Sequence, residues 1–274
     1  GTPKFFGDEM SFFIENSNRS FSINLAREWL LKNDFDDDFG PVKNFHNSPS
    51  SLFNGMVAPA TPYGIKGFIW YQGESNASRP ELYAQIFPEL IRNWRTHWGL
   101  GDLPFLFVQL SNLELTHEFH KTNSSWSNLR AAQQSTLALP NTGMVVSLDI
   151  GNPYNIHPAN KQDFGDRLAL QAMDIAYDKP VVANGPSYTS FSVEGNTVVV
   201  RFGEAIKLRK NAVGLGASFE VAGEDGKFVE ATGKVKGSSL HISSSEVSLP
   251  KAVRFGWSNN PEYYIINKAG QLVE

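Results

Sequence analysis

Between Ile65 and Pro180, short apolar runs alternate with segments whose apolar positions recur every three or four residues. The clearest such segment predicts a helix over Pro80–Trp98, because Pro80 suits a first helical turn and the following Gly99 suits a helix end. Its apolar stripe consists of Leu82, Ile86, Leu90, Trp94 and Trp98. The same periodicity predicts helices over Trp126–Leu139 and Asn160–Tyr177, and buried strands over Ile65–Tyr71, Pro104–Leu110 and Gly143–Leu148. Repeated strand–helix units predict an α/β fold in three layers, with a mainly parallel sheet covered by helices on both faces.

The pattern changes after Pro180. A turn-like sequence, Asn184-Gly185-Pro186, is followed by short apolar segments separated by glycine-containing turns. The predicted strands are Ser190–Val193, Thr197–Phe202, Ser218–Val221, Ser239–Ile242, Val253–Trp257 and Tyr263–Ile266. Many short strands with regular turn signals are typical of a β-sandwich-like region.

The first 49 residues are irregular apart from one predicted helix. Phe21, Leu25, Trp29 and Leu30 are spaced as on one helical face, and Ser20 or Ser22 can cap its start. We therefore predict three parts: an N-terminal extension over residues 1–49, an α/β domain over residues 50–183, and a β-rich domain over residues 184–274.

Composition narrows the function classes. The chain has 274 residues, a formal net charge of -4 and no cysteine. This balance gives no reason to expect binding to nucleic acid or to an anionic membrane, and no apolar run is long enough to cross a bilayer. Thiolate catalysis and cysteine-ligated metals are excluded. The sequence His117-Glu118-Phe119-His120 lacks the spacing of a helical zinc motif, so no metal site is expected.

Two polar clusters follow predicted strands. The first is Gln72-Gly73-Glu74-Ser75-Asn76, and the second runs from Asp149 to His157. Parallel strands end at one edge of a sheet, so we expect both clusters to contribute to one active site there. His157 lies in a loop before a predicted helix, where it can act as general base for a hydroxyl nucleophile or simply cap that helix.

The remaining residues of the two clusters have open roles. Glu74 or Asp149 can orient an imidazole, and the Gln72 amide or the Gly73 N–H can bind an oxyanion. The same groups can equally satisfy the loop backbone.

Three neighbouring residues are further candidates. Asn76 and Arg79 are candidates for substrate binding, with Arg79 suited to an anionic substrate or to a surface salt bridge. Ser75 lies in a near match to the G-x-S-x-G nucleophile elbow, which makes it a possible nucleophile.

Several longer motifs are distinctive in combination: Leu52–Pro59, Ile65–Ala77, Leu129–Gln133, Asn155–Lys161, Gly165–Leu170 and Ala252–Trp257. In this order they resemble the sialate O-acetylesterase family, within the SGNH-type esterases. The resemblance is dense over about residues 50–180. It implies an SGNH/flavodoxin-like sheet and a secreted or periplasmic serine esterase that removes O-acetyl groups from sialic acids without cofactor or metal. His157 matches the family's catalytic histidine, and Gln72, Gly73 and Glu74 match a signature loop beside the scissile ester.

The chain departs from the family pattern at two places. The G-Q-S-N-M block that carries the family's nucleophile is missing, and the family's aspartate shortly before the histidine is replaced by Tyr154 or Asn155. Asp149 or Glu74 can take over as the orienting acid, or the histidine has none. By resemblance Ser75 is a loop residue, whereas the local pattern still allows it as the nucleophile.

The missing block has a consequence for the fold. Loss of a central strand would leave backbone groups of its neighbours unpaired, which is costly. We expect the sheet to be completed by another polypeptide, such as an N-terminal piece of the same precursor, or else by residues 1–50. Three functions remain open: an esterase acting on O-acetylated sialic acid, an acetylxylan esterase-like enzyme using Ser75, and a catalytically degenerate module that only binds acetylated sugar.

Overall fold

The computed structural model describes residues 13–15, 22–24, 50–113, 125–214 and 216–273. The chain divides into two compact units, Gly1–Val57 and Ala58–Glu274. In the first unit, β1 (Phe13–Glu15) pairs antiparallel with β2 (Ser22–Asn24), and a short helical segment, η2, spans Phe53–Val57. The predicted N-terminal helix is wrong at Ser22–Asn24, which form a strand paired with β1. The remaining residues of that predicted helix lie outside the described residues.

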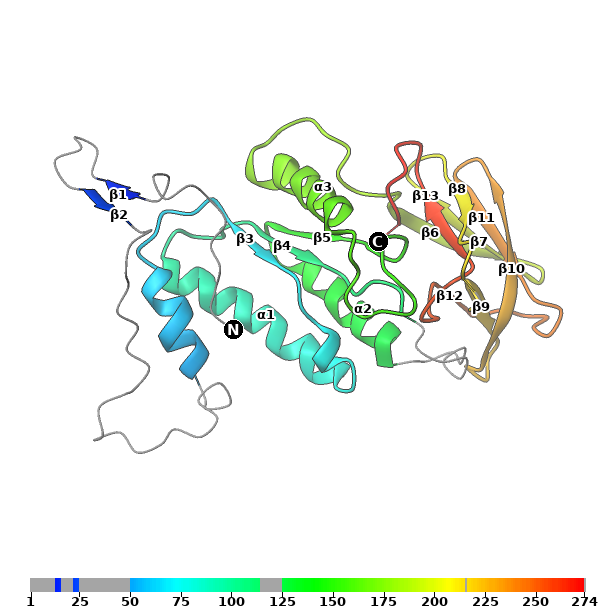
Figure 1. The fold of residues 1–274 in the computed structure, drawn as a ribbon. Coiled ribbons are helices and arrows are strands. Elements are labelled where there is room, and N and C mark those ends of the chain that lie inside the picture. The colour runs from blue at the N-terminus through cyan, green and yellow to red at the C-terminus, as the bar shows by residue number, and fades with distance from the viewer. Residues whose placement is uncertain (1–12, 16–21, 25–49, 114–124, 215, 274) are drawn as a thin grey trace. The chain divides into compact units, whose positions relative to one another are not determined.

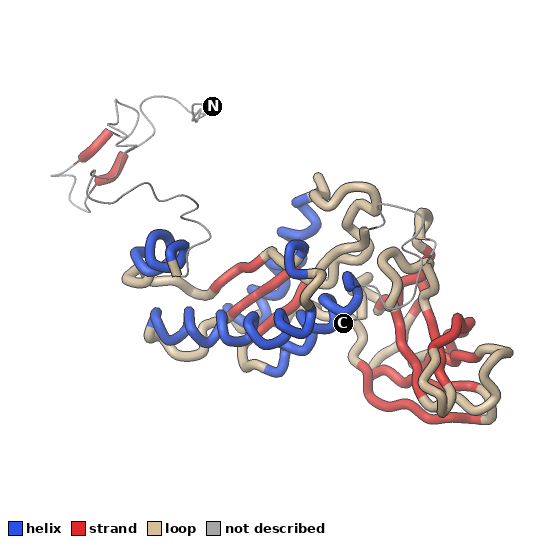
Figure 2. Tube along the Cα trace, turned by 90° about the horizontal axis from the view of Figure 1, so that it is seen from below, coloured by secondary structure: helices blue, strands red, loops and turns tan. Residues whose placement is uncertain are grey.

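The second unit begins with a parallel three-stranded sheet. Its strands are β3 (Phe68–Trp70), β4 (Phe105–Val108) and β5 (Thr142–Val145), paired in the order β3-β4-β5. Figures 1 and 2 show these strands side by side. Phe68 is paired with Phe105, which is paired in turn with Thr142. The segments that follow the three strands therefore leave the sheet at the same edge.

Helices connect these strands. α1 (Pro80–Trp98) joins β3 to β4, α2 (Ser125–Ser135) precedes β5, and α3 (Lys161–Gln171) follows it. The bounds of α1 agree with the prediction, because Pro80 occupies its first turn and Gly99 ends it in the left-handed conformation. Shorter helical turns are η3 (Ala58–Ala60), η4 (Glu74–Asn76), η6 (Thr136–Ala138) and η7 (Ala172–Ala176).

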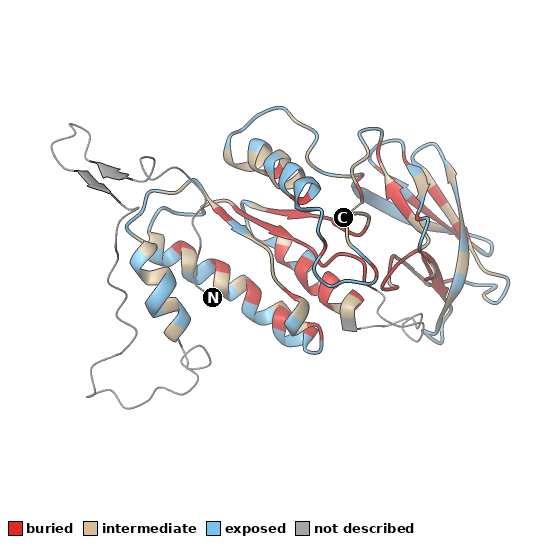
Figure 3. Ribbon diagram, viewed as in Figure 1, coloured by how far each residue is buried: buried red, intermediate tan, exposed pale blue. Residues whose placement is uncertain are grey.

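The two faces of the sheet carry separate apolar clusters. On one face, Phe87 of α1 and Leu129 of α2 belong to the same buried cluster as Phe105 and Phe107. On the other, Phe164 of α3 packs with Val108 and Val145. Figure 3 shows buried residues concentrated in β4, β5 and α2. Strand side chains alternate between faces, so β4 is buried on both sides, as its continuous apolar sequence predicts.

The C-terminal part of the second unit is antiparallel. Six strands pair in the order β12-β9-β10-β11-β7-β6, and β13 pairs with β8. Their bounds are β6 Tyr188–Glu194, β7 Thr197–Phe202, β8 Lys207–Lys210, β9 Phe219–Ala222, β10 Phe228–Lys236, β11 Ser239–Ser243, β12 Ala252–Phe255 and β13 Tyr263–Ile266. The predicted strands all have counterparts here, whereas β8 and β10 were missed.

Buried polar contacts join the parallel sheet and its helices to the antiparallel part. The Arg130 guanidinium on α2 donates to the carbonyl oxygens of Gly256 at 2.7 Å and Ser258 at 2.6 Å. The Tyr264 hydroxyl donates to the Leu148 carbonyl at 3.1 Å. Burial lowers the pKa of Arg130 to about 10. The loop that follows β5 is thereby fastened to the C-terminal strands.

The broad fold prediction is confirmed, since an α/β part with a parallel sheet precedes antiparallel sheets. The SGNH-type arrangement and the boundary at residue 184 stay predictions. Within the described ranges, every helix is too short or too polar to cross a bilayer.

Candidate active site

An open cavity of about 500 Å³ lies where the two predicted polar clusters meet. Its described lining consists of Tyr71, Glu74, Ser75, Ile156, His157 and Lys161. The first three residues follow β3, Ile156 and His157 lie in the loop before α3, and Lys161 is the first residue of α3. The structure thus brings Glu74, Ser75 and His157 to one solvent-accessible cavity, although His157 follows Ser75 by 82 positions in the sequence.

The corner after β3 is fixed by close packing around a glycine. Gly73 is buried, and a Cβ atom there would lie 3.0 Å from Gln133 Nε2 and 3.1 Å from the nearest methyl carbons of Leu110 and Leu129. Gln72 donates from Nε2 to Asn76 Oδ1 at 2.7 Å. These two amides are therefore paired with each other across the turn, and neither belongs to the described lining of the cavity.

Gln133 ties this corner to the next strand. Its side chain is fully buried; Oε1 accepts the Leu110 backbone N–H at 2.8 Å, and Nε2 donates to the carbonyl oxygens of Gln72 at 3.2 Å and Val108 at 3.3 Å. The chain therefore turns at the same level after β3 and after β4. Gln133 lies in a motif of the family resemblance, but the sequence did not indicate this role.

The loop before α3 presents His157 to solvent. Asparagine side chains stabilise its turns: Asn155 Oδ1 accepts the His157 backbone N–H and Asn152 Oδ1 accepts that of Tyr154, both at 2.9 Å. The His157 imidazole is exposed and makes no hydrogen bond or ion pair with any described residue. Its ring nitrogens are therefore available to a nucleophile or a substrate.

Asp149 has other partners. Its two oxygens accept from Arg167 at 2.6 and 2.7 Å, and Arg209 also donates to one of them. The carboxylate is nearly buried and does not belong to the described lining of the cavity. Asp149 thus links the loop after β5 to α3 and β8, and both of its oxygens are bound to guanidinium groups. Arg167 and Arg209 were not predicted to take part.

Tyr71, which lines the cavity, is backed by the buried ring of Phe164. Tyr71 and Phe164 stack with centroids 5.1 Å apart, and the Lys161 ammonium lies 4.9 Å from the Tyr71 centroid. Burial, together with the charge of Glu74, raises the pKa of Tyr71 to about 12. The phenol is consequently neutral at ordinary pH. Sequence reasoning missed this group, because Lys161 is separated from Tyr71 by 90 positions.

Arg79 occupies a different place. It lies at the N-terminal end of α1, is exposed, and does not belong to the described lining of the cavity. The positive charge that the structure brings to the site is that of Lys161.

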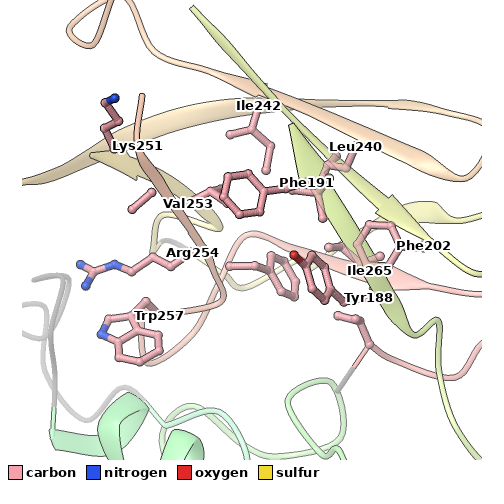
Figure 4. Close-up of a pocket in the computed structure, with 14 residues that line it drawn as sticks. Tyr188, Phe191, Phe202, Leu240, Ile242, Lys251, Val253, Arg254, Trp257 and Ile265 are labelled. Atoms are coloured by element: carbon pink, nitrogen blue, oxygen red, sulfur yellow. The ribbon is translucent and has the colours of Figure 1, made fainter. Parts of the chain in front are cut away.

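A second cavity, of about 590 Å³, lies among the C-terminal strands. Figure 4 shows apolar and aromatic side chains, including Phe191, Phe202 and Ile242, around it, with the head groups of Lys251 and Arg254 directed away. Arg254 is paired with Glu220 at 2.7 Å. The described lining of this second cavity holds no histidine, carboxylate or serine, the residue types predicted for the active site. In the part of the chain that the structure describes, no group of three or more His, Asp or Glu side chains is arranged to hold a metal ion.

Comparisons with known proteins identify similar proteins for much of the chain. Residues 41–174 match the family described as carbohydrate esterase, sialic acid-specific acetylesterase. The chain is 36% identical over 166 residues to the sialate O-acetylesterase of Mus musculus and 33% identical over 171 residues to that of Homo sapiens. It is also similar to the crystal structure of a carbohydrate acetylesterase from Xanthomonas citri, with a TM-score of 0.73 and 41% identity over 81% of this chain.

These matches cover only part of each relative. They include 29% of the mouse protein, 31% of the human protein and 52% of the Xanthomonas chain. The chain thus spans about half the length of the bacterial structure and under a third of the curated relatives.

The role of Gln133 is testable by replacing its amide with a side chain of similar size. In Gln133→Met, the buried Leu110 N–H loses its acceptor, so we expect the free energy of unfolding in urea to fall by about 1–3 kcal/mol. Gln134→Met changes an exposed neighbour in the same way and should alter stability by less than about 0.5 kcal/mol. Equal effects of the two substitutions would show that the buried amide is not what holds the corner.

Proposed function

Because residues 41–174 belong to the sialic acid-specific acetylesterase family of carbohydrate esterases, we propose that this chain forms the histidine side of an active site that removes O-acetyl groups from sialic acids. The observation that carries the proposal is the shared cavity of His157, Glu74 and Ser75. An imidazole without a partner among the described residues, next to the corner that follows β3, supports this proposal, because a hydrolase of this type needs a base beside its nucleophile.

The reaction proceeds by acyl transfer to serine. A serine hydroxyl attacks the acetyl carbonyl while His157 accepts its proton; the imidazolium then protonates the sugar oxygen as the ester bond breaks. Water, deprotonated by the same imidazole, hydrolyses the acetyl-enzyme and releases acetate. Gln72 and Gly73 are outside the described lining but directly precede the lining residue Glu74, so the Gly73 N–H and the second N–H of the Gln72 amide are our candidates for binding the oxyanion. The pairing of Gln72 with Asn76 fixes the plane of that amide.

We assign the orienting role to Glu74 or to Asn155 rather than to Asp149. Both oxygens of Asp149 are held by arginines, whereas Glu74 lies in the cavity and forms no ion pair with the described residues. Asn155 stands two residues before His157, at one of the two positions where the resemblance places the family's aspartate, and an amide oxygen can also orient an imidazole. Asp149 then has a structural role, holding the loop that carries His157.

The nucleophile is proposed to come from a complementary N-terminal polypeptide of the same precursor. Among the described strands, β3 pairs with β4 and no other, so its far edge offers free backbone groups. On the α3 side of the sheet, Ile69 in β3 is 67% exposed, whereas Leu106 in β4 is 3% exposed. An apolar side chain so exposed on a parallel sheet indicates a missing neighbour and a missing cover. A strand carrying the serine would supply both.

Ser75 supports a second possibility. Ser75 is exposed and lines the same cavity as His157. If Ser75 were the nucleophile, the chain would need no further polypeptide to hydrolyse acetylated sugars, including acetylxylan. Its turn, η4, spans only Glu74–Asn76 before α1 begins at Pro80, unlike the direct strand-to-helix turn of a nucleophile elbow. We therefore favour the complemented esterase. By family we also propose a secreted or periplasmic location.

Replacement of the base gives the direct test. In the assembled enzyme, His157→Ala should lower kcat for acetate release from O-acetylated sialic acid by about three orders of magnitude, because it removes the imidazole that is proposed to accept the serine proton. We expect a similar decrease in kcat when p-nitrophenyl acetate is the substrate.

The matched control for this test is His97→Ala. His97 is an exposed histidine near the end of α1, and its replacement should leave turnover near normal. Near-normal turnover of His157→Ala would refute the assignment of the base.

Asn155, one of the two candidate positions of the family's aspartate, allows a gain-of-function test. In Asn155→Asp, an oxygen still accepts the His157 N–H, and the added negative charge stabilises the imidazolium that forms during catalysis; kcat should rise by about tenfold or more. Asn152→Asp adds the same charge to the same loop and should have a much smaller effect. A loss of activity in Asn155→Asp, with its unfolding free energy unchanged, would assign the orienting role to Glu74 alone.

A further inference from the structure

Lys161 is the first residue of α3 and lines the candidate active site. Its ammonium lies 4.9 Å from the centroid of Tyr71 and 5.3 Å from that of Phe164. These rings stack on each other with an angle of 22° between their planes. Cation–π contact with the two rings holds the charged end of a flexible side chain at the wall of the cavity.

The neighbouring carboxylates of α3 are occupied elsewhere. Asp163 Oδ2 accepts from the Asn160 side chain at 2.7 Å, and Asp166 Oδ1 accepts from that of Gln162 at 2.8 Å. Across the described residues, no carboxylate lies within ion-pair distance of Lys161. The ammonium is therefore exposed, partly oriented, and free to bind an anion.

We propose that Lys161 binds the carboxylate of an acidic sugar substrate and so selects acidic over neutral acetylated sugars. This inference rests on the proposed esterase function and adds the residue that determines specificity. Glu74 lines the same cavity and would repel the substrate carboxylate. The opposite signs of Glu74 and Lys161 thus favour one orientation, with the carboxylate at Lys161 and the acetyl ester on the side of Glu74 and His157.

A carboxylate would complete the environment of this ammonium better than a neutral sugar. Hydrogen bonds between two charged groups are shorter and stronger than those between neutral groups, and the aromatic wall excludes water from one side of the cation. A neutral sugar offers only hydroxyl acceptors, which replace water at little gain. Arg79, the other cation considered for an anionic substrate, stands outside the described lining of the cavity.

The test compares a charged ligand with its uncharged counterpart. N-acetylneuraminic acid and its methyl ester are titrated into the chain, and dissociation constants are measured by NMR. We expect the wild type to bind the acid about fivefold or more tightly than the ester, and Lys161→Met to lose this preference. Lys161→Arg should retain most of it, since a guanidinium also binds carboxylates.

Two further variants control for unspecific charge effects. Lys234→Met removes an exposed lysine from β10 and should keep the wild-type preference, and so should Arg79→Met. Equal binding of acid and ester by the wild type would overturn the proposal. It would also be overturned if Lys161→Met kept the preference, or if Arg79→Met lost it.

A second readout separates this proposal from the proposed function. Acetate release is measured from O-acetylated N-acetylneuraminic acid and from its methyl ester with the assembled enzyme, and the ratio of the two kcat/KM values is compared between variants. Lys161→Met should lower that ratio about fivefold or more. If the wild type releases acetate from neither compound, the esterase function fails, whereas the binding titration still decides the role of Lys161.

Discussion

The structure of the candidate site depends on the buried carboxamide of Gln133. By bonding to the backbone at the ends of both β3 and β4, it sets the level at which the chain leaves the sheet after each strand. Gly73 can pack against this amide only because it lacks a side chain. The Gln72-Gly73-Glu74 corner is therefore determined by the core beneath it, and its position at the rim of the cavity follows from the packing of α2 against the sheet.

The loop on the other side of the cavity is held electrostatically. Asp149, paired with Arg167 of α3 and Arg209 of β8, joins the end of the parallel sheet to the C-terminal strands. Breaking the ion pairs of a nearly buried carboxylate with two guanidinium groups is costly, because the charged groups would be left without their counterions. The C-terminal β region thus helps to support the loop that presents His157. One side of the site is held by a neutral amide and the other by an ion-pair network.

Most local signals in the second unit predicted the right element, whereas contacts between distant parts of the sequence were not predicted. α1 and β13 agree with prediction because Pro80, Gly99 and the apolar run at Tyr263–Ile266 act locally. β10 was missed because its nine residues mix charged positions with Gly233, whose side-chain space is filled by the Phe219 ring. The partners of Asp149 and the place of Lys161 beside Tyr71 arise only from tertiary packing. The two polar clusters were recognised in advance, because each directly follows a strand, but their fine contacts were not.

The central claim is that this chain provides the base of an esterase site whose nucleophile is carried by another polypeptide. The most direct measurement is reaction of the active protein with a fluorophosphonate, followed by peptide mapping of the modified serine. We expect one modified serine in a co-purifying polypeptide outside residues 1–274, with labelling reduced in His157→Ala. Modification of Ser75 within this chain alone would contradict it.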